Sequence, residues 1–237
     1  MKNCIVIIIF ISLLGCSAKV PMNQDDICVI IDENPKWSNS LLDAKKKWNA
    51  EPSTVMAIIR QESSFDANAA PDREKVLGFI PWKRPSSARG YSQAVEATWE
   101  QYQKETGNGR ARRSNFDSSV DFIGWYLSKA PSARIRSYEV DKLYIAYHEG
   151  YGGYKRKSFK DKAWLQDVAK KVKYNSIRYQ RQLKSCPLKK KKSFFNIVEI
   201  LLIKKFSFAA VFSRFGLMIE KTLYLCDLSF SAASTIS

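Results

Sequence analysis

The sequence is poor in metal-binding residues and in acidic side chains. His148 is its one histidine, and its five cysteines lack the spacing of a zinc site. His148-Glu149 begins like the HExxH motif, but no second histidine follows, so we expect neither a metal nor another cofactor. Asp and Glu number 23 against 39 Lys and Arg. The resulting net charge of +16 favours an anionic partner, which could be nucleic acid, a membrane surface or an acidic polymer.

No hydrophobic run is long enough to span a bilayer comfortably. A charged start is followed by the apolar run "CIVIIIFISLL" over residues 4–14, which is typical of a secretory signal peptide over residues 1–15. The next residues, Leu13-Leu14-Gly15-Cys16, resemble the lipobox of bacterial lipoproteins, which implies lipid modification of Cys16. The residue after this cysteine is Ser17 rather than Asp, which resembles the pattern of lipoproteins sorted to the outer membrane. The alternative is an ordinary signal followed by an incidental cysteine.

An exported chain meets the cell envelope rather than nucleic acid. We therefore expect a lipoprotein of the outer membrane that faces the periplasm and is held there by its lipid. In an oxidising compartment Cys28 and Cys186 could form a disulfide that closes a long loop and stabilises the fold by roughly 4 kcal/mol. The alternative is a pair of unpaired buried thiols.

The chain divides into three parts after the signal. Residues 16–36 are interpreted as a tether, residues 37–186 as one mainly α domain without internal repeats, and residues 187–237 as a basic and apolar tail. The tail could be an interfacial amphipathic anchor or an adventitious extension. Within the domain, a long irregular segment over residues 66–89 separates the first helices from the later ones, and its apolar content indicates a packed or ligand-lining loop.

One ionisable residue stands where a helix pattern predicts a hydrophobic one. Val55, Ile58 and Ile59 form an apolar stripe in a helix opened by Pro52, and the next stripe position is Glu62. Near a helix C-terminus and partly desolvated, this carboxyl would have a raised pKa and could act as a general acid. The alternative is a fully hydrated glutamate at a frayed helix end.

A second apolar helical stripe, later in the chain, also ends in a side chain with a polar head group. Val140, Leu143, Tyr144 and Tyr147 occupy the same offsets, so a phenol stands where the first helix has a carboxyl. Two such helix ends could meet at the floor of a cleft, where the Tyr147 hydroxyl would hydrogen-bond Glu62.

Three short motifs resemble those of one enzyme family. Glu62-Ser63-Ser64-Phe65 is similar to its Glu-Ser-x-Phe signature, Gly90-Tyr91-Ser92-Gln93 to its Gly-Leu-Met-Gln segment, and Ala146-Tyr147-His148 followed by Gly150 to its Ala-Tyr-Asn-x-Gly segment. This is the soluble-lytic-transglycosylase-like (SLT) family of the lysozyme-like superfamily, which includes the goose-type fold. The resemblance covers residues 37–182. It implies cleavage of the β-1,4 bond between N-acetylmuramic acid and N-acetylglucosamine in peptidoglycan, with anhydromuramic acid ends as products.

The resemblance also implies roles for individual residues. Glu62 would protonate the glycosidic oxygen and then act as a base, supported by Ser63 and Tyr147. The candidates for substrate binding are Ser64, Tyr91, Gln93 and His148, with Trp82 and Tyr151 as further faces for sugar rings. Phe65 is interpreted as a packing residue.

The sequence departs from the family pattern in three places, and two other functions remain open. The loop before Gly90 is long, Tyr91-Ser92 replaces Leu-Met, and His148 replaces the usual Asn. A hydrolytic muramidase would need a second carboxylate, for which the candidates are Asp66, Asp72, Glu74 and Glu149. A peptidoglycan-binding scaffold would need none.

Overall fold

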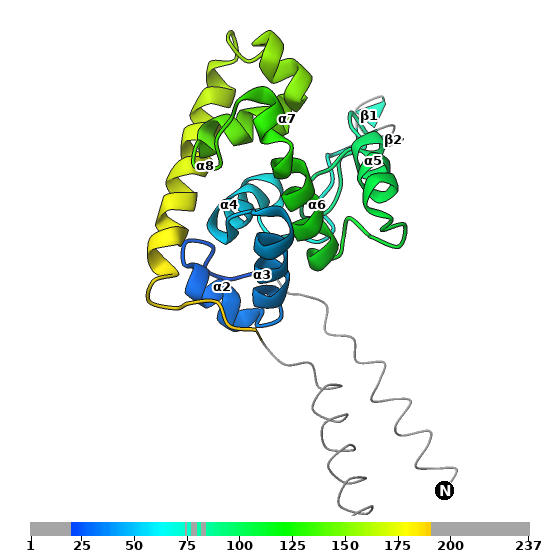
Figure 1. Cartoon of the computed structure of the whole chain (residues 1–237). Helices are drawn as coiled ribbons and strands as arrows, with labels where there is room; N and C mark the ends of the chain where they lie inside the picture. The colour runs from blue at the N-terminus through cyan, green and yellow to red at the C-terminus, as the bar shows by residue number, and fades with distance from the viewer. Residues whose placement is uncertain (1–19, 74, 77–79, 82–83, 191–237) are drawn as a thin grey trace, which may run out of the picture. The chain divides into compact units, whose positions relative to one another are not determined.

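The computed structural model describes residues 20–73, 75–76, 80–81 and 84–190. This part of the chain is mainly α, as predicted. Its helices and strands are α2 (Ile27–Glu33), α3 (Trp37–Trp48), α4 (Pro52–Ser63), β1 (Lys75–Val76), β2 (Ile80–Pro81), α5 (Glu96–Thr106), α6 (Phe116–Ser128), the 3-10 helix η1 (Ala130–Ala133), α7 (Val140–Arg156) and α8 (Ala163–Gln182). Figure 1 shows their arrangement.

Helix α4 forms the centre of the domain. Pro52 occupies its first turn, where a missing backbone N–H costs nothing, and every residue from Pro52 to Ile59 is buried. A helix that is buried all round must be covered on several sides, and α8 packs along one of them while α3 and α6 contact others (Figure 1). The predicted helix from Pro52 is therefore confirmed, and it carries the chain to Glu62.

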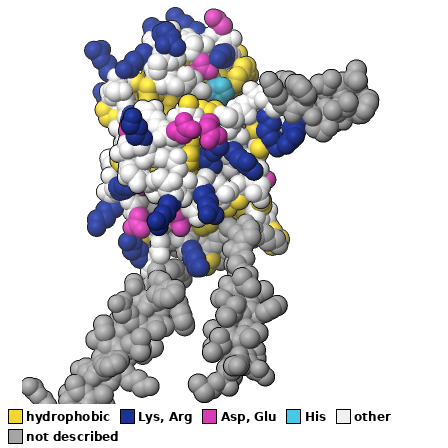
Figure 2. Space-filling view, turned by 90° about the vertical axis from the view of Figure 1, so that its right-hand side faces the viewer, with side chains coloured by type: hydrophobic (Ala, Val, Ile, Leu, Met, Phe, Trp, Pro, Cys, Tyr) yellow, Lys and Arg dark blue, Asp and Glu magenta, His cyan; other side chains and the backbone are white. Residues whose placement is uncertain are grey.

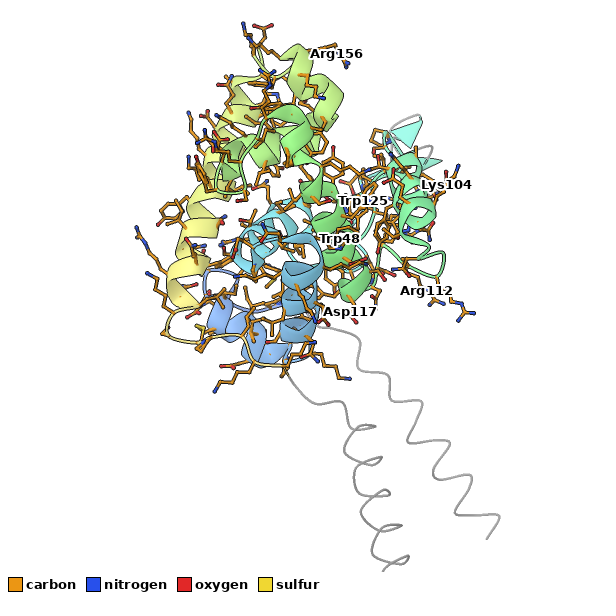
Figure 3. The ribbon with its side chains drawn as sticks, viewed as in Figure 1. Trp48, Lys104, Arg112, Asp117, Trp125 and Arg156 are labelled. Carbon is orange, nitrogen blue, oxygen red and sulfur yellow. A yellow bond between two sulfur atoms is a disulfide. The ribbon has the colours of Figure 1, made fainter. Side chains whose placement is uncertain are left out.

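A shared carboxylate ties together three helices beside α4. Asp121 on α6 accepts hydrogen bonds from Trp48 Nε1 of α3 and from the Tyr102 hydroxyl of α5, both at 2.7 Å. Trp48 lies where α3 meets α6 (Figure 3), and a Cβ atom on Gly124 would come within 2.6 Å of its Cδ1 atom. Close helix packing at this glycine fixes one wall of the site described below.

The segment interpreted as a tether is folded over its described part. Asp26 caps α2, and Ile27 and Ile30 are fully buried, so residues 20–36 belong to the domain rather than to a linker. The prediction was wrong here because a seven-residue helix shows too little periodicity to recognise. The predicted Cys28–Cys186 disulfide is present, with Cα atoms 5.8 Å apart, and joins α2 to the segment that follows α8.

The long loop and the glycine-rich helix end differ in detail from expectation. Residues 66–89 are mostly irregular, but β1 and β2 pair antiparallel within them. Glycines often end a helix, whereas α7 bends at Gly150, with φ 73° and ψ 156°, and continues to Arg156. Glycine allows this bend because it tolerates a positive φ.

Several predictions fall outside the described residues. They are the signal peptide, the lipidated Cys16, Glu74, Trp82 and the tail from residue 191 onward. The first tail residues are described, and there Lys190 pairs with Asp43 at 2.7 Å. Among the described helices, none combines the length and the apolar character needed to cross a membrane.

Candidate active site

A cleft of about 520 Å³ lies between the end of α4, the start of α5, α6 and the middle of α7. Its lining brings together residues from all three motifs of the sequence: Glu62, Gln93, Tyr147, His148 and Gly150. The remaining lining residues are Ser86, Ala88, Ala94, Val95, Thr98, Phe122, Tyr126 and Glu149. The three motifs therefore meet at this cleft, and α6 contributes further lining from outside them.

Glu62 lines this cleft with a buried carboxyl, one of whose oxygens is unpaired. Its Oε1 atom is buried and has no hydrogen-bond partner among the described residues. Burial raises the pKa of Glu62 to about 7, and a hydrogen bond from the Tyr144 hydroxyl opposes this shift more weakly. A carboxyl with this pKa is protonated in a substantial fraction of molecules at neutral pH, as a general acid requires.

Tyr144, rather than Tyr147, is the phenol that contacts the carboxyl. The Tyr147 hydroxyl donates instead to the Ser92 carbonyl oxygen at 2.7 Å. Burial, and then the charge of Glu62, raises the pKa of both phenols, so each remains a hydrogen-bond donor. The prediction chose the wrong member of the stripe because Tyr144 and Tyr147 are one turn apart and face the same side of α7.

Ser63 supports the site indirectly. Its buried hydroxyl bonds the carbonyl oxygens of Ile59, at 3.1 Å, and of Tyr91, at 2.9 Å. Ser63 was predicted to support Glu62, but neither of these contacts is with Glu62. They connect the last turn of α4 to the segment Gly90–Gln93, so Ser63 holds the two motifs together.

Gln93 lines the cleft in a strained conformation. Its φ of 47° lies in the left-handed region, and its Nε2 atom donates to the carbonyl oxygens of Ala69 at 2.9 Å and Gly90 at 2.8 Å. Both amide hydrogens are thereby used within the loop. Gln93 was predicted to bind substrate, and its acceptor atom Oε1 is the part of the amide left for a ligand.

Two candidates for substrate binding, Tyr91 and Ser64, lie away from the cleft lining, as does the predicted packing residue Phe65. Tyr91 is 1% exposed and packs edge-on against Trp37 and Phe116, so it is a core residue and offers no face to a sugar. Ser64 ends α4 with φ 51° and gives its carbonyl oxygen to Gln24, which is the capping role. Phe65 is fully buried, as predicted.

His148 and Glu149 form one edge of the cleft. The His148 side chain is 38% exposed, and its Nδ1 atom lies 3.1 Å from Glu149 Oε1. Glu149 is held by Lys162, whose Nζ atom is 2.8 Å from Oε1 and 3.0 Å from Oε2. This ion pair, with hydrogen bonds from Ser158 and His148, lowers the pKa of Glu149 to about 2.

An aromatic wall lies beside Glu62, and its member Tyr126 was not predicted. Tyr126 and Tyr147 line the cleft, whereas Tyr151, predicted as a face for sugar rings, is not among the lining residues. The rings of Tyr126 and Tyr147 meet edge-on at 5.1 Å, and those of Tyr126 and Tyr151 stack at 5.0 Å. The hydroxyls of Tyr126 and Tyr151 donate to backbone carbonyl oxygens, which fixes both rings. The helical stripe of α6 marks Phe122 and Tyr126 as buried, but no sequence signal says that they face a cleft.

The described residues contain no group of three or more side chains that could hold a metal ion.

Comparisons with known proteins agree with the geometry. No curated protein matches the chain. The family described as Transglycosylase SLT domain matches residues 4–186, which is most of the chain and includes all three motifs. The chain therefore belongs to the transglycosylase SLT domain family.

Proposed function

We propose that this protein is a lytic transglycosylase that cleaves the β-1,4 bond between N-acetylmuramic acid and N-acetylglucosamine and leaves 1,6-anhydro ends. Membership of the family indicates a transglycosylase-type enzyme that acts on peptidoglycan. The observation that carries the specific reaction is the buried Glu62 carboxyl, with a pKa near 7, at the floor of the cleft.

One carboxyl is sufficient for this reaction. Protonated Glu62 gives its proton to the glycosidic oxygen as the bond from that oxygen to C1 breaks. The resulting carboxylate then takes the proton of the muramic acid C6 hydroxyl as that oxygen bonds C1, which closes the anhydro ring and restores protonated Glu62. No water is consumed, because the nucleophile is already tethered beside the reacting carbon.

The other carboxylates support this choice over hydrolysis. A hydrolytic enzyme generally uses a second free carboxylate as base or nucleophile. Of the candidates within the described residues, Asp66 and Asp72 do not line the cleft, and Glu149 does. However, Lys162 and Ser158 occupy the oxygens of Glu149, so it is poorly suited to attack a sugar or activate water.

We further propose that the protein is exported, lipidated at Cys16 and held at the outer membrane facing the periplasm. Its basic side chains suit an envelope rich in carboxylates and phosphates. Lys and Arg are spread over the face seen in Figure 2, and the exposed Lys104, Arg112 and Arg156 lie on separate elements in Figure 3. Mass spectrometry of the mature protein would detect the lipid.

Digestion of purified sacculi tests the reaction. We expect the parent chain to release muropeptides with anhydro ends, and we expect Glu62→Gln to lower turnover about 10²- to 10⁴-fold, because the amide cannot transfer the proton. Glu51→Gln is the matched control, since Glu51 lies at the other end of α4 in an exposed ion pair with Lys45.

Three outcomes would contradict this proposal. Reducing ends in place of anhydro ends would identify a muramidase. Binding of sacculi without turnover by the parent chain would identify a scaffold. Undiminished turnover by Glu62→Gln would remove Glu62 from the mechanism.

A further inference from the structure

Glu149 is almost fully enclosed although it lies beside an open cleft. Its side chain is 6% exposed and is surrounded by His148, Ser158 and Lys162; we call these four residues the α7 network. Lys162 approaches both carboxylate oxygens, and the Ser158 hydroxyl donates to Oε2. The proposed reaction gives none of these contacts a role.

The bend in α7 makes this network possible. Gly150 has φ 73°, so the helix changes direction immediately after Glu149. Beyond the bend, the chain returns toward the carboxylate at Gly153. A Cβ atom on Gly153 would come within 2.9 Å of Ser158 Oγ and within 3.1 Å of Glu149 Cβ, so a larger residue would separate the network. Gly150 and Gly153 thus allow the chain to enclose Glu149 while α7 continues beyond the bend.

The contacts of Glu149 determine where the histidine carries its proton. An ionised carboxylate can only accept hydrogen bonds. Lys162 keeps Glu149 ionised, and its lowered pKa of about 2 agrees with this. The contact of 3.1 Å with Glu149 Oε1 therefore requires a proton on His148 Nδ1. In the neutral ring Nε2 is then unprotonated and is an acceptor.

The ring itself is held in place by a second contact. The indole of Trp164, from the start of α8, meets the imidazole edge-on with the ring centroids 5.3 Å apart. His148 lines the cleft, and among the described residues Nε2 makes no hydrogen bond. The ring is thus oriented on one side by Glu149 and on the other by Trp164.

We propose that Glu149 is a positioning residue that holds His148 as the Nδ1-protonated tautomer, so that Nε2 accepts a hydrogen bond from a ligand N–H or O–H group in the cleft. This inference rests on the proposed function for the identity of the ligand, a glycan with hydroxyl and acetamido donors. Gln93, with both amide hydrogens used internally, offers an acceptor to the same cleft. His148 Nε2 and Gln93 Oε1 are both acceptors, so together they favour a ligand whose N–H or O–H groups donate hydrogen bonds to the cleft.

The first test reads the tautomer directly. Because the chain has one histidine, ¹⁵N labelling of imidazole gives one set of ring signals in the full-length protein. At pH 8, above the ordinary pKa of histidine, we expect Nδ1 to be protonated in the parent chain. We expect Glu149→Ala to shift the ring toward the Nε2-protonated form. Glu139→Ala is the control. Like Glu149, Glu139 pairs with a lysine, in this case Lys142, but it occupies the N-cap position at the start of α7 and makes no contact with the imidazole.

The second test measures turnover. Loss of one positioned hydrogen bond predicts that Glu149→Ala raises KM about 3- to 10-fold, with a smaller effect on kcat. If circular dichroism shows that Glu149→Ala does not fold, Glu149→Gln replaces it. Its amide can donate as well as accept, so the expected result is a mixture of both tautomers.

The two failures can be told apart. An Nε2-protonated ring in the parent chain, or an unchanged tautomer in a folded Glu149 variant, would overturn the positioning role whatever the enzyme does. Absence of turnover in a chain that shows the expected tautomers would refute the proposed reaction and leave the α7 network as described.

Discussion

At the scale of single residues, Glu62 combines a catalytic requirement with a cost in stability. A carboxyl that loses hydration without gaining a full set of partners is harder to ionise in the folded chain than in the unfolded one. The same burial that raises the pKa of Glu62 from its ordinary value of 4.5 to about 7 therefore destabilises the fold wherever the group is ionised. Tyr144 offsets only part of this cost.

Glu62→Gln should stabilise the protein at high pH. Between pH 4.5 and 7 the folded chain keeps the proton on Glu62 while the unfolded chain loses it. The stability of the parent chain is therefore highest below pH 4.5 and falls as the pH rises through 7. At pH 8 we expect the variant to gain on the order of 2–3 kcal/mol in free energy of unfolding, and at pH 4 we expect no difference. Urea unfolding at both pH values measures this. An equal effect at pH 4 and pH 8 would mean that Glu62 is hydrated.

At the scale of elements, the segment Gly90–Gln93 places one wall of the site by backbone geometry. Gly90 has φ 72°, and a Cβ atom there would lie 2.0 Å from the Arg113 carbonyl oxygen. This contact positions the turn in which Gln93 takes its left-handed conformation and Ser63 binds the Tyr91 carbonyl oxygen. The glycine of this motif is thus required for close approach of two backbone segments.

Gly90→Ala should therefore disrupt both the fold and the cleft. We expect it to cost more than about 2 kcal/mol of stability and to reduce turnover, because the backbone of Arg113 cannot move aside as a flexible side chain would. Gly107→Ala is the matched control: its φ is also positive, at 69°, but no atom lies within 4 Å, so we expect a loss of about 1 kcal/mol. Equal thermal shifts in the two variants would contradict the role of close approach.

At the scale of the whole described domain, the N-terminal segment fastens the end of α4 to α8. Asp25 pairs with Arg60 of α4 at 2.7 Å and with Arg178 of α8 at 2.6 Å, and Gln24 donates to the Ser64 carbonyl oxygen. The disulfide at Cys28 closes this arrangement across 158 residues of chain. Contacts distant in sequence thus hold the helix end that carries Glu62.

Removal of the disulfide should weaken the domain. We expect the double variant Cys28→Ser and Cys186→Ser to lose about 2–5 kcal/mol in free energy of unfolding, chiefly because the unfolded chain is no longer cross-linked. The parent chain with a reducing agent should match the variant, and the variant itself should not respond to the reducing agent. A parent chain whose stability is insensitive to reduction would contradict a stabilising bridge.

The sequence by itself determined the mainly α class, most helix positions and the placing of Glu62 at the end of a buried helix. These follow from local physics, because helical period and turn residues act over a few neighbouring positions. The pair Cys28 and Cys186 was also predicted, since the expected signal peptide and lipid would remove Cys4 and Cys16 from pairing.

Only the tertiary structure decided which side chains meet. Helical period placed Tyr144 and Tyr147 on one face but could not say which phenol reaches Glu62, nor that Tyr91 turns into the core. Likewise, the enclosure of Glu149 depends on a bend at Gly150 that brings Lys162 back toward it. Such contacts depend on how distant segments pack, to within about an ångström, and neighbouring residues do not encode that distance.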